Sequence, residues 1–233
     1  MEQWQLTPVA VVRSDFQEKF GIPRQSGLVE ELRARVVFLP EFRSREALRG
    51  IEEFSHLWLV WGFSQHLGKG WSPTVRPPRL GGKERRGVFA TRSPFRPNPL
   101  GLSCVELLSV EWDAPDGPAL VIGGADLLDG TPVFDIKPYV PLSDCRPQAV
   151  GGFSDAHRED HLLVEFPPEL EEKVPQEKRR ALRGVLAGDP RPSYQRDPGR
   201  VYGLSFAGLE VRFTVAGETL TVEEVEPRGP EKN

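Results

Sequence analysis

Hydrophobic residues in the first 140 positions of the chain gather in short runs, and glycine- and proline-rich turns separate one run from the next. Runs of this length predict β-strands rather than helices. The most apolar run, Leu57-Trp58-Leu59-Val60-Trp61-Gly62-Phe63, is rich in strand-forming residues and predicts a buried central strand. The predicted strands cover residues 6–13, 34–39, 57–63, 87–91, 100–110, 119–124 and 131–135. Because little helix separates them, the pattern favours an antiparallel barrel or sandwich over βαβ units.

One short helix interrupts this series, with Ser44 as its cap and Leu48 as its last residue. After Pro141 the pattern changes, and residues 146–164 are polar, contain glycine and predict a linker. From residue 170 to 186, apolar positions recur every three or four residues, which predicts an amphipathic helix that ends at Gly188 and has Pro175 in its first turns.

Three alternating segments at 201–206, 209–215 and 218–225 then predict strands, with Ala216-Gly217 as a hairpin turn. We therefore predict a β domain over residues 1–145, a linker over 146–164, and a small α+β domain over 165–233. Residues 226–233 are predicted to form a loose tail.

Composition and charge narrow the possible partners. The 233 residues include 23 glycines and 23 prolines, which fits many turns and argues against long helices. The net charge of −4 argues against binding nucleic acid through bulk charge, so an RNA partner requires a segregated basic surface. Residues 76–96 show such segregation, with seven basic residues against the single acid Glu84. These are Arg76, Arg79, Lys83, Arg85, Arg86, Arg92 and Arg96.

Prolines and glycines keep this basic segment from being helical, and arginines on a stiff backbone suit phosphates or carboxylates. A solvated basic loop is the simpler interpretation of a charge run. Here Phe89, Phe95, Asn98 and Tyr139 add the aromatic and amide groups that base stacking and base-edge contacts need. The combination favours a functional surface.

Several common chemistries lack their motifs. The sequence has no GxGxxG, GxxxxGK[ST], HExxH, GxSxG or CxxC pattern. Cys104 lies within an apolar strand pattern and is expected in the core. His157 and His161 are four residues apart but fall in the predicted linker, so we expect no metal site. With no targeting segment and no apolar run near the roughly 20 residues that span a bilayer, we expect a cytoplasmic protein.

The remaining candidates are polar residues beside predicted strands, and each has a structural alternative. Asp126 and Asp129 could make an Asx turn before Gly130, and Asp135 with Lys137 could be an ion pair at a strand edge. These side chains can form one functional site only if the fold brings them close together in space.

Several stretches, in order along the chain, resemble the bacterial tRNA N6-threonylcarbamoyladenosine methyltransferases, also called the TsaA-like or YaeB family, of which the TrmO enzymes are type members. The stretches are residues 22–25, 54–58, 76–82, 87–101, 126–139 and 189–194. The resemblance implies methyl transfer from S-adenosylmethionine to N6 of threonylcarbamoyl-adenosine beside the tRNA anticodon. It also implies a single-sheeted antiparallel β-barrel of the class VIII type, followed here by the small α+β domain, and a homodimer.

The resemblance also implies a cofactor site. Its residues are Pro23, Arg24, Gln25, Ser64, Gln65, Arg92, Leu102, Asp126, Leu127, Leu128 and Asp129. Where the family pattern has a histidine before the glutamine, this chain has Ser64, so Gln65 is the better match of the two. An arginine fits the cofactor's carboxylate, aspartates fit its ammonium or ribose hydroxyls, and the backbone of Leu102 can contact adenine.

For the tRNA step, residue type and position indicate Asp135 or Tyr139 as the acceptor of the N6 proton, with Lys137 beside them. Basic and aromatic residues are expected to hold phosphates, the threonine carboxylate or the base. These are Arg86, Phe95, Arg96, Asn98, Arg191 and Tyr194. Two other functions stay open: an RNA-binding module without catalysis, and a small-molecule hydrolase.

Overall fold

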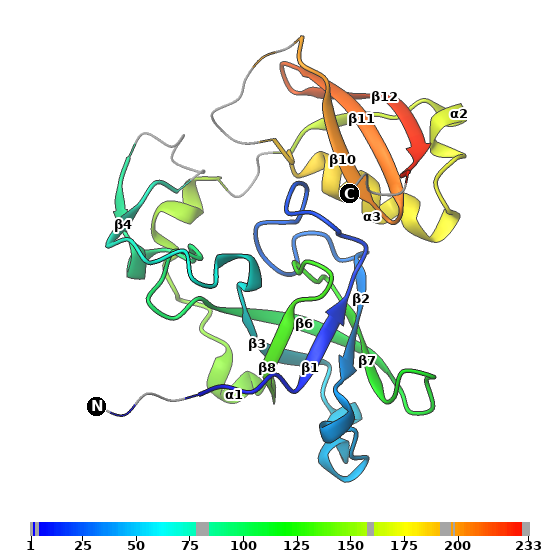
Figure 1. The fold of residues 1–233 in the computed structure, drawn as a ribbon. Coiled ribbons are helices and arrows are strands. Elements are labelled where there is room, and N and C mark those ends of the chain that lie inside the picture. Colours follow the sequence, from blue (N-terminus) through cyan, green and yellow to red (C-terminus); the bar gives the residue numbers. More distant parts are fainter. Residues whose placement is uncertain are drawn as a thin grey trace.

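The computed structural model describes residues 2, 5–77, 84–157, 161–191, 197 and 199–229, and its regular structure is mainly β (Figure 1). The strands are β1 (Ala10–Arg13), β2 (Arg33–Phe38), β3 (His56–Gly62), β4 (Thr74–Val75), β5 (Arg86–Gly87), β6 (Leu100–Glu111), β7 (Ala119–Gly123), β8 (Pro132–Pro138), β9 (Leu163–Glu165), β10 (Tyr202–Phe206), β11 (Leu209–Ala216) and β12 (Thr219–Pro227). The α-helices are α1 (Pro141–Asp144), α2 (Pro168–Glu171) and α3 (Gln176–Ala187). The prediction of a mainly β chain with antiparallel pairing is confirmed.

Six strands of the first 140 residues form one antiparallel sheet in the order β1-β2-β7-β6-β3-β8, and the pairing of β8 with β1 closes it. Alternate side chains point inward, as the strand period requires. Val12, Val36, Leu57, Leu59 and Ile122 are fully buried and form the centre of its core. The predicted central strand, β3, pairs with β6 on one side and with β8 on the other.

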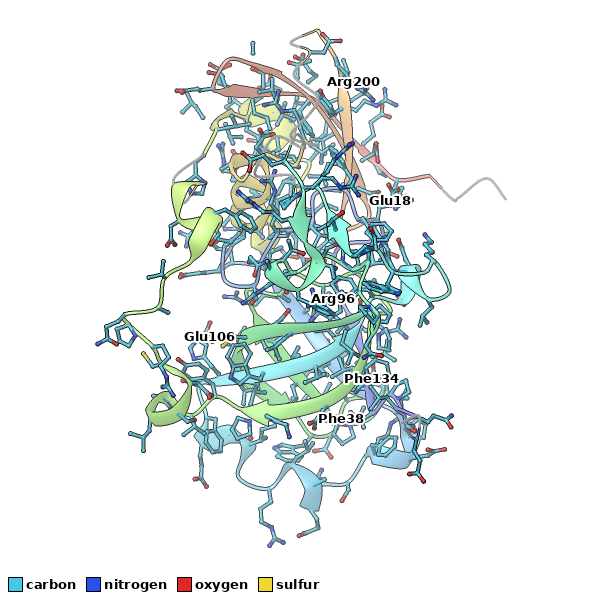
Figure 2. All side chains as sticks on the ribbon, turned by 90° about the vertical axis from the view of Figure 1, so that its left-hand side faces the viewer. Glu18, Phe38, Arg96, Glu106, Phe134 and Arg200 are labelled. Atoms are coloured by element: carbon cyan, nitrogen blue, oxygen red, sulfur yellow. The ribbon has the colours of Figure 1, made fainter. Side chains whose placement is uncertain are left out.

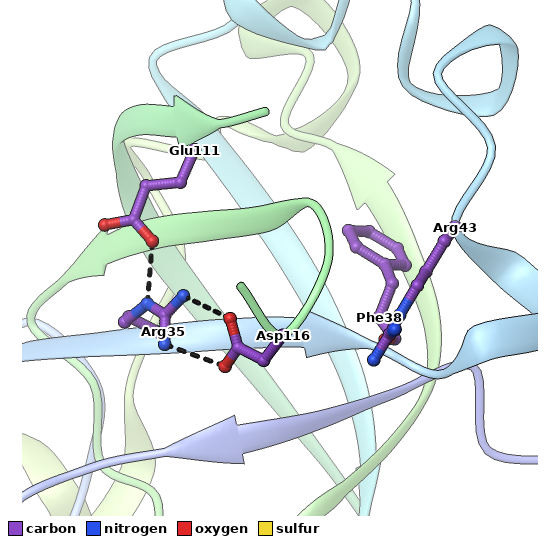
Figure 3. Close-up of polar contacts among 5 residues, drawn as sticks. All are labelled: Arg35, Phe38, Arg43, Glu111 and Asp116. Atoms are coloured by element: carbon purple, nitrogen blue, oxygen red, sulfur yellow. Dashed lines mark hydrogen bonds and ion pairs between the residues drawn. The ribbon is translucent and has the colours of Figure 1, made fainter. Parts of the chain in front are cut away.

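An arginine cluster ties the turn between β6 and β7 to β2 (Figure 3). The Arg35 guanidinium donates to Glu111 Oε2 at 2.8 Å and to both oxygens of Asp116 at 2.9 and 3.0 Å. The hydrogen bonds that Arg35 donates to Asp116 lower the pKa of the Asp116 carboxyl. Nearby, Arg43 donates to the carbonyl of Phe38 at 3.0 Å. None of these five residues lines the cavity described below.

Three local predictions in the first part of the chain are wrong. Strand β1 begins at Ala10 rather than at residue 6, because Pro8 has no N–H to donate to a neighbouring strand. Ser44 caps no α-helix, since only the 3-10 turn Glu46–Leu48 forms there and no side chain caps it. Residues 88–90 make a 3-10 turn instead of a strand: Val88 is buried, and its carbonyl accepts the backbone N–H of Thr91 at 3.1 Å.

The amphipathic helix predicted over residues 170–186 is two helices, α2 and α3. Pro175 stands between them in an extended conformation, since it cannot donate the hydrogen bond that a continuous helix needs. The predicted linker contains the 3-10 helix Gly152–His157 and the start of β9, which pairs in parallel with β12. The predicted tail also begins too early, because Glu226 and Pro227 still pair with β11.

The second sheet has the order β10-β11-β12-β9 and packs on α3. Its core is shared with the first part of the chain, because Phe16, Val29 and Leu32 are buried in the same cluster as Leu182 and Phe213. Figure 1 shows the loops between β1 and β2 reaching up to this second sheet. The two sheets are therefore joined by a common apolar core.

Candidate functional site

A cavity of about 590 Å³ opens beside the closed sheet, between the loop after β1, the end of β3 and the start of β6. Its polar lining residues are Lys19, Arg24, Gln25, Ser64, Gln65, His66, Thr91, Arg92, Arg96, Asp126 and Thr131. Its apolar lining residues are Ile22, Pro23, Val60, Trp61, Gly62, Phe63, Pro94, Leu100, Gly101, Leu102 and Leu128. Residues separated by more than 100 positions in the sequence thus meet around one space.

A hydrogen-bonded chain forms one wall of the cavity. Trp61 Nε1 donates to Ser103 Oγ at 3.0 Å, and Ser103 Oγ donates to Asp126 Oδ1 at 2.7 Å. Ser103 is buried, so both of its bonds are made away from bulk water. Gly101 makes room for the indole of Trp61, because a Cβ there would lie 2.3 Å from that ring. The wall therefore holds the Asp126 carboxylate in one orientation.

Burial raises the pKa of Asp126. The hydrogen bond from Ser103, backbone hydrogen bonds and the positive charge of Arg92 act in the opposite direction and favour the carboxylate. An acid that is largely removed from water and only partly compensated is suited to accept a cationic group.

Arg92 supplies the opposite charge at the same cavity. It follows the turn Val88–Ala90, and its Nη1 donates to Gln25 Oε1 across from the loop after β1. The guanidinium keeps further donors for a planar anion, which it can bind through two parallel hydrogen bonds. Arg92 and Asp126 together can therefore hold a molecule that carries both a carboxylate and an ammonium group.

Aromatic and basic side chains also gather at the cavity. The His66 ring meets Phe95 edge-on, with centroids 5.0 Å apart, and lies 6.2 Å from the ring of Phe63. Burial lowers the pKa of His66, and the charges of Lys19 and Lys69 lower it further. Lys19 Nζ is 3.3 Å from His66 Nδ1. The imidazole is consequently neutral over more of the physiological pH range than an ordinary histidine.

Nine of the eleven residues predicted for the cofactor site line this cavity. They are Pro23, Arg24, Gln25, Ser64, Gln65, Arg92, Leu102, Asp126 and Leu128. The other two, Leu127 and Asp129, lie outside it. Leu127 is buried in the core of the closed sheet, and Asp129 accepts the backbone N–H of Ser14 at 3.0 Å and faces Arg13 at 3.5 Å. These contacts hold the 126–129 segment in place.

None of the three residues predicted for catalysis lines the cavity. Asp135 and Lys137 form an ion pair at 2.9 Å, which is the strand-edge alternative noted above. In the sheet register Asp135 is opposite Val60, which does line the cavity. Tyr139 packs on Trp58 with ring centroids 5.9 Å apart. Burial and then nearby Cys145, Cys104 and Asp144 raise the pKa of the Tyr139 hydroxyl.

The residues predicted to contact tRNA are dispersed. Arg96 lines the cavity and lies between the closed sheet and the second sheet (Figure 2); its Nη1 donates to the carbonyl of Thr91 at 2.7 Å. Phe95 and Asn98 are exposed on the same loop. Arg86 is exposed and donates to Glu84 at 2.7 Å.

In the second part of the chain, Arg191 is only 10% exposed and makes a two-pronged ion pair with Asp189, at 2.8 and 3.0 Å. It does not line the cavity. Tyr194, and Arg79 and Lys83 of the basic segment, lie outside the described residues.

The sequence did not single out Trp61, Ser103 or Lys19 as site residues. Trp61 and Ser103 lie in apolar strand patterns, where residue type alone indicates core packing, and Lys19 carries no motif. His66 follows the apolar run at residues 57–63 and carries no motif either. Cys104 is half-buried in β6, and burial raises the pKa of its thiol.

Among the described residues, no group of three or more His, Cys, Asp or Glu side chains is arranged to hold a metal ion. No helix in that part of the chain has the length and apolar character to cross a membrane.

Comparison with known proteins gives consistent matches over both parts of the chain. A family model described as the tRNA-methyltransferase O N-terminal domain matches residues 11–145, and one described as the TrmO C-terminal domain matches residues 159–228. The tRNA (adenine(37)-N6)-methyltransferase of Escherichia coli (strain K12) is 41% identical, over 98% of this chain and 100% of that protein.

A putative S-adenosylmethionine-dependent methyltransferase of Pseudomonas aeruginosa, RcsF, is 42% identical over 89% of this chain and 91% of that protein. The crystal structure of TrmO from Pseudomonas aeruginosa superposes with a TM-score of 0.77 at 34% identity, covering 97% of this chain and 100% of that one.

Proposed function

This chain belongs to the tRNA-methyltransferase O family, and from that premise we propose that it transfers a methyl group from S-adenosylmethionine to N6 of an adenosine in tRNA. The observation that carries the proposal is that Arg92 and Asp126 line the same cavity. S-adenosylmethionine ends in a carboxylate and an ammonium group, which are the partners that this pair of charges can bind.

The rest of the cavity fits the same molecule. Its volume of about 590 Å³ falls within the roughly 300–1,000 Å³ that is usual for small-molecule sites. Phe63, Leu102 and Leu128 offer apolar surface to the nucleoside end. Pro23, Arg24 and Gln25 close one side, and Gln25 is already held by Arg92.

S-adenosylmethionine supplies a methyl group that is already activated on a sulfonium, so the residues of this chain act by positioning and by accepting one proton. Arg92 and Asp126 orient the amino-acid end, and Gln25 orients Arg92. Asp135 is the proposed acceptor of the N6 proton, because it lies across from Val60 beside the cavity. Tyr139 is the weaker acceptor, since its raised pKa keeps the hydroxyl protonated at neutral pH.

We further propose the finer features that the sequence resemblance implied. The substrate is threonylcarbamoyl-adenosine next to the anticodon. Its threonylcarbamoyl group withdraws electrons from N6, which eases loss of the N6 proton. Lys137, Arg86 and Arg96 hold phosphates or the threonine carboxylate, while Phe95 and Asn98 contact the base. Arg191 and Tyr194 contribute from the second domain.

The proposal also covers the architecture. The closed six-stranded sheet corresponds to the single-sheeted barrel of class VIII methyltransferases, within a domain spanning residues 1–145. Residues 146–164 connect it to a second domain at 165–233. The working form is a cytoplasmic homodimer, in which a partner subunit brings further residues to the tRNA side of the site.

The direct test is nucleoside mass spectrometry of tRNA from cells lacking the protein, with the purified protein then added back together with S-adenosylmethionine. We expect the methylated threonylcarbamoyl-adenosine to disappear and to be restored. tRNA binding without uptake of S-adenosylmethionine would instead support a binding module. Turnover of a small molecule with no gain of a methyl group in tRNA would support a hydrolase.

We expect tRNA binding to weaken steeply with salt although the chain carries a net charge of −4. The basic residues of the 76–96 segment motivate this, because each phosphate they neutralise contributes roughly 0.7–0.9 to the slope of log affinity against log salt. Fluorescence anisotropy with labelled tRNA between low and physiological salt measures the slope. Replacing Arg85 and Arg86, both exposed, with alanine should lower it by about one to two. A flat salt dependence in the unmodified protein would mean that the segment does not contact RNA.

A further inference from the structure

The loop that carries Pro23, Arg24 and Gln25 packs against the second sheet. Phe16 meets Phe206 edge-on, with ring centroids 5.4 Å apart, and Phe20 stacks on Phe213 at 6.4 Å. Phe16 and Phe206 are buried in the apolar core that both parts of the chain share. Residues nearly 200 positions further along the chain therefore support the loop on the side that packs against the second sheet.

At Gly21 the loop lies directly against Leu204 of β10. Its backbone is in the left-handed region, with φ of +87°, and a Cβ at this position would lie 2.1 Å from Leu204 Cδ1. Leu204 is fully buried, so its side chain has no free space into which it could move. The next residue, Ile22, packs on the same core and also lines the cavity. Only one residue, Ile22, thus separates Gly21 from Pro23 and the cofactor side of the loop.

Polar contacts fix the start of the same loop. The backbone N–H of Ala207 donates to the carbonyl of Asp15 at 3.0 Å, and Lys178 of α3 pairs with the Asp15 carboxylate. Arg228 pairs with Glu18 at 2.7 Å, and Figure 2 shows Glu18 beside the second sheet. Contacts from α3, from the turn after β10 and from the end of β12 all converge on this one loop.

We propose that the second domain positions the cofactor-binding loop, with Leu204 against Gly21 as the principal contact. Through this contact the second domain sets where Gln25 meets Arg92 at the cavity. Leu204 is accordingly a positioning residue that touches neither cofactor nor tRNA. The inference rests on the proposed function, because it takes the cavity as the site of S-adenosylmethionine.

Two substitutions in the full-length protein test it: Gly21→Ala, which forces the loop away from Leu204, and Leu204→Ala, which removes the support. We expect the Kd for S-adenosylmethionine, measured by calorimetry at a temperature where each variant is folded, to rise about tenfold in each; a tenfold change corresponds to about 1.4 kcal/mol. The KM for S-adenosylmethionine should rise in parallel. The kcat at saturating cofactor and the KM for tRNA should stay within about twofold of wild type, because Leu204 lies behind the loop and contacts neither ligand.

Two matched controls separate positioning from general loss of stability. Gly217→Ala places the same kind of backbone strain, at φ +61°, in the β11–β12 hairpin, where a Cβ meets nothing within 4 Å. Leu220→Ala opens a similar hole in the same core from another fully buried leucine. Both controls should lower the melting temperature yet leave the Kd for S-adenosylmethionine unchanged. Leu204→Val, a smaller truncation, replaces Leu204→Ala if the latter does not fold.

The double variant Gly21→Ala/Leu204→Ala tests whether the two residues act through one contact. Once the leucine is gone the added methyl group has no clash to make, so the double variant should bind S-adenosylmethionine about as weakly as either single variant, and not about a hundredfold more weakly than wild type. Folded Gly21→Ala and Leu204 variants that bind S-adenosylmethionine as wild type would overturn the positioning role, as would equal weakening by Leu220→Ala. An unmodified protein that takes up no S-adenosylmethionine would overturn the proposed function itself.

Discussion

Replacing Arg92 with alanine should abolish tRNA methylation while leaving the protein folded. The Arg92 side chain lines the cavity and donates to Gln25, but it is exposed on a loop and supports no core packing. Arg92 is open to water in the free protein, but a bound cofactor would cover its guanidinium. Loss of one partner from such a covered, charge-assisted contact costs about 2–5 kcal/mol, which is roughly a 30-fold to several thousand-fold loss of affinity. Calorimetry with S-adenosylmethionine and a methylation assay, with circular dichroism for the fold, measure the effect.

Two further variants sharpen this test. Arg92→Lys keeps the positive charge but not the planar fork, so it should recover only a small part of the activity. Arg49→Ala removes an exposed arginine that pairs with Glu46 and does not line the cavity, and it should leave methylation unchanged. Wild-type activity in a well-folded Arg92→Ala protein would remove Arg92 from the site.

Replacing Asp126 with asparagine should weaken cofactor binding by a similar factor and at the same time stabilise the free protein at neutral pH. The asparagine keeps the shape of the side chain and can still accept the hydrogen bond from Ser103, but it has no charge to offer an ammonium group. Because burial raises the pKa of Asp126, ionising this carboxyl costs the folded protein free energy that an amide does not cost.

The sign of the pH dependence follows from that raised pKa. Between the pKa of Asp126 in the unfolded chain and its higher pKa in the folded protein, the folded state binds more protons, so this residue's contribution to stability falls as pH rises. The affinity for S-adenosylmethionine should rise over the same window, because the carboxylate is the form that binds the ammonium. In Asp126→Asn, neither the stability nor the affinity for S-adenosylmethionine should change with pH in this way.

Urea unfolding and calorimetry at several pH values measure these two slopes. Ser103→Ala serves as a control that keeps the carboxyl group and removes the hydrogen bond favouring its ionised form, so it should move the affinity slope to higher pH rather than remove it. An Asp126→Asn protein that binds S-adenosylmethionine as tightly as wild type would exclude an ammonium contact at this residue.

The strands of both sheets were largely predictable, because alternating or continuous apolar runs are a local property of the chain. The run at residues 57–63 is the central strand β3, and the alternation near residues 209–225 is the β11–β12 hairpin. Predictions failed where a tertiary contact or a proline changed the local outcome. Val88 is buried and starts a 3-10 turn where its apolar neighbours indicated a strand, and Pro175 divides the predicted helix.

The sequence by itself determined the mainly β class, the family and, through family resemblance, nine residues that do line the cavity. Only the tertiary structure decided that Leu127 and Asp129 hold the segment rather than line the cavity, and that Ser103 orients Asp126. It also decided that Leu204 lies behind the cofactor loop. The physical reason is distance along the chain. Hydrophobic periodicity reports which face of a strand is buried, whereas the contacts of Arg92 with Gln25 and of Lys178 with Asp15 join residues 67 and 163 positions apart. Such contacts arise only when the closed sheet and the shared core bring these segments together.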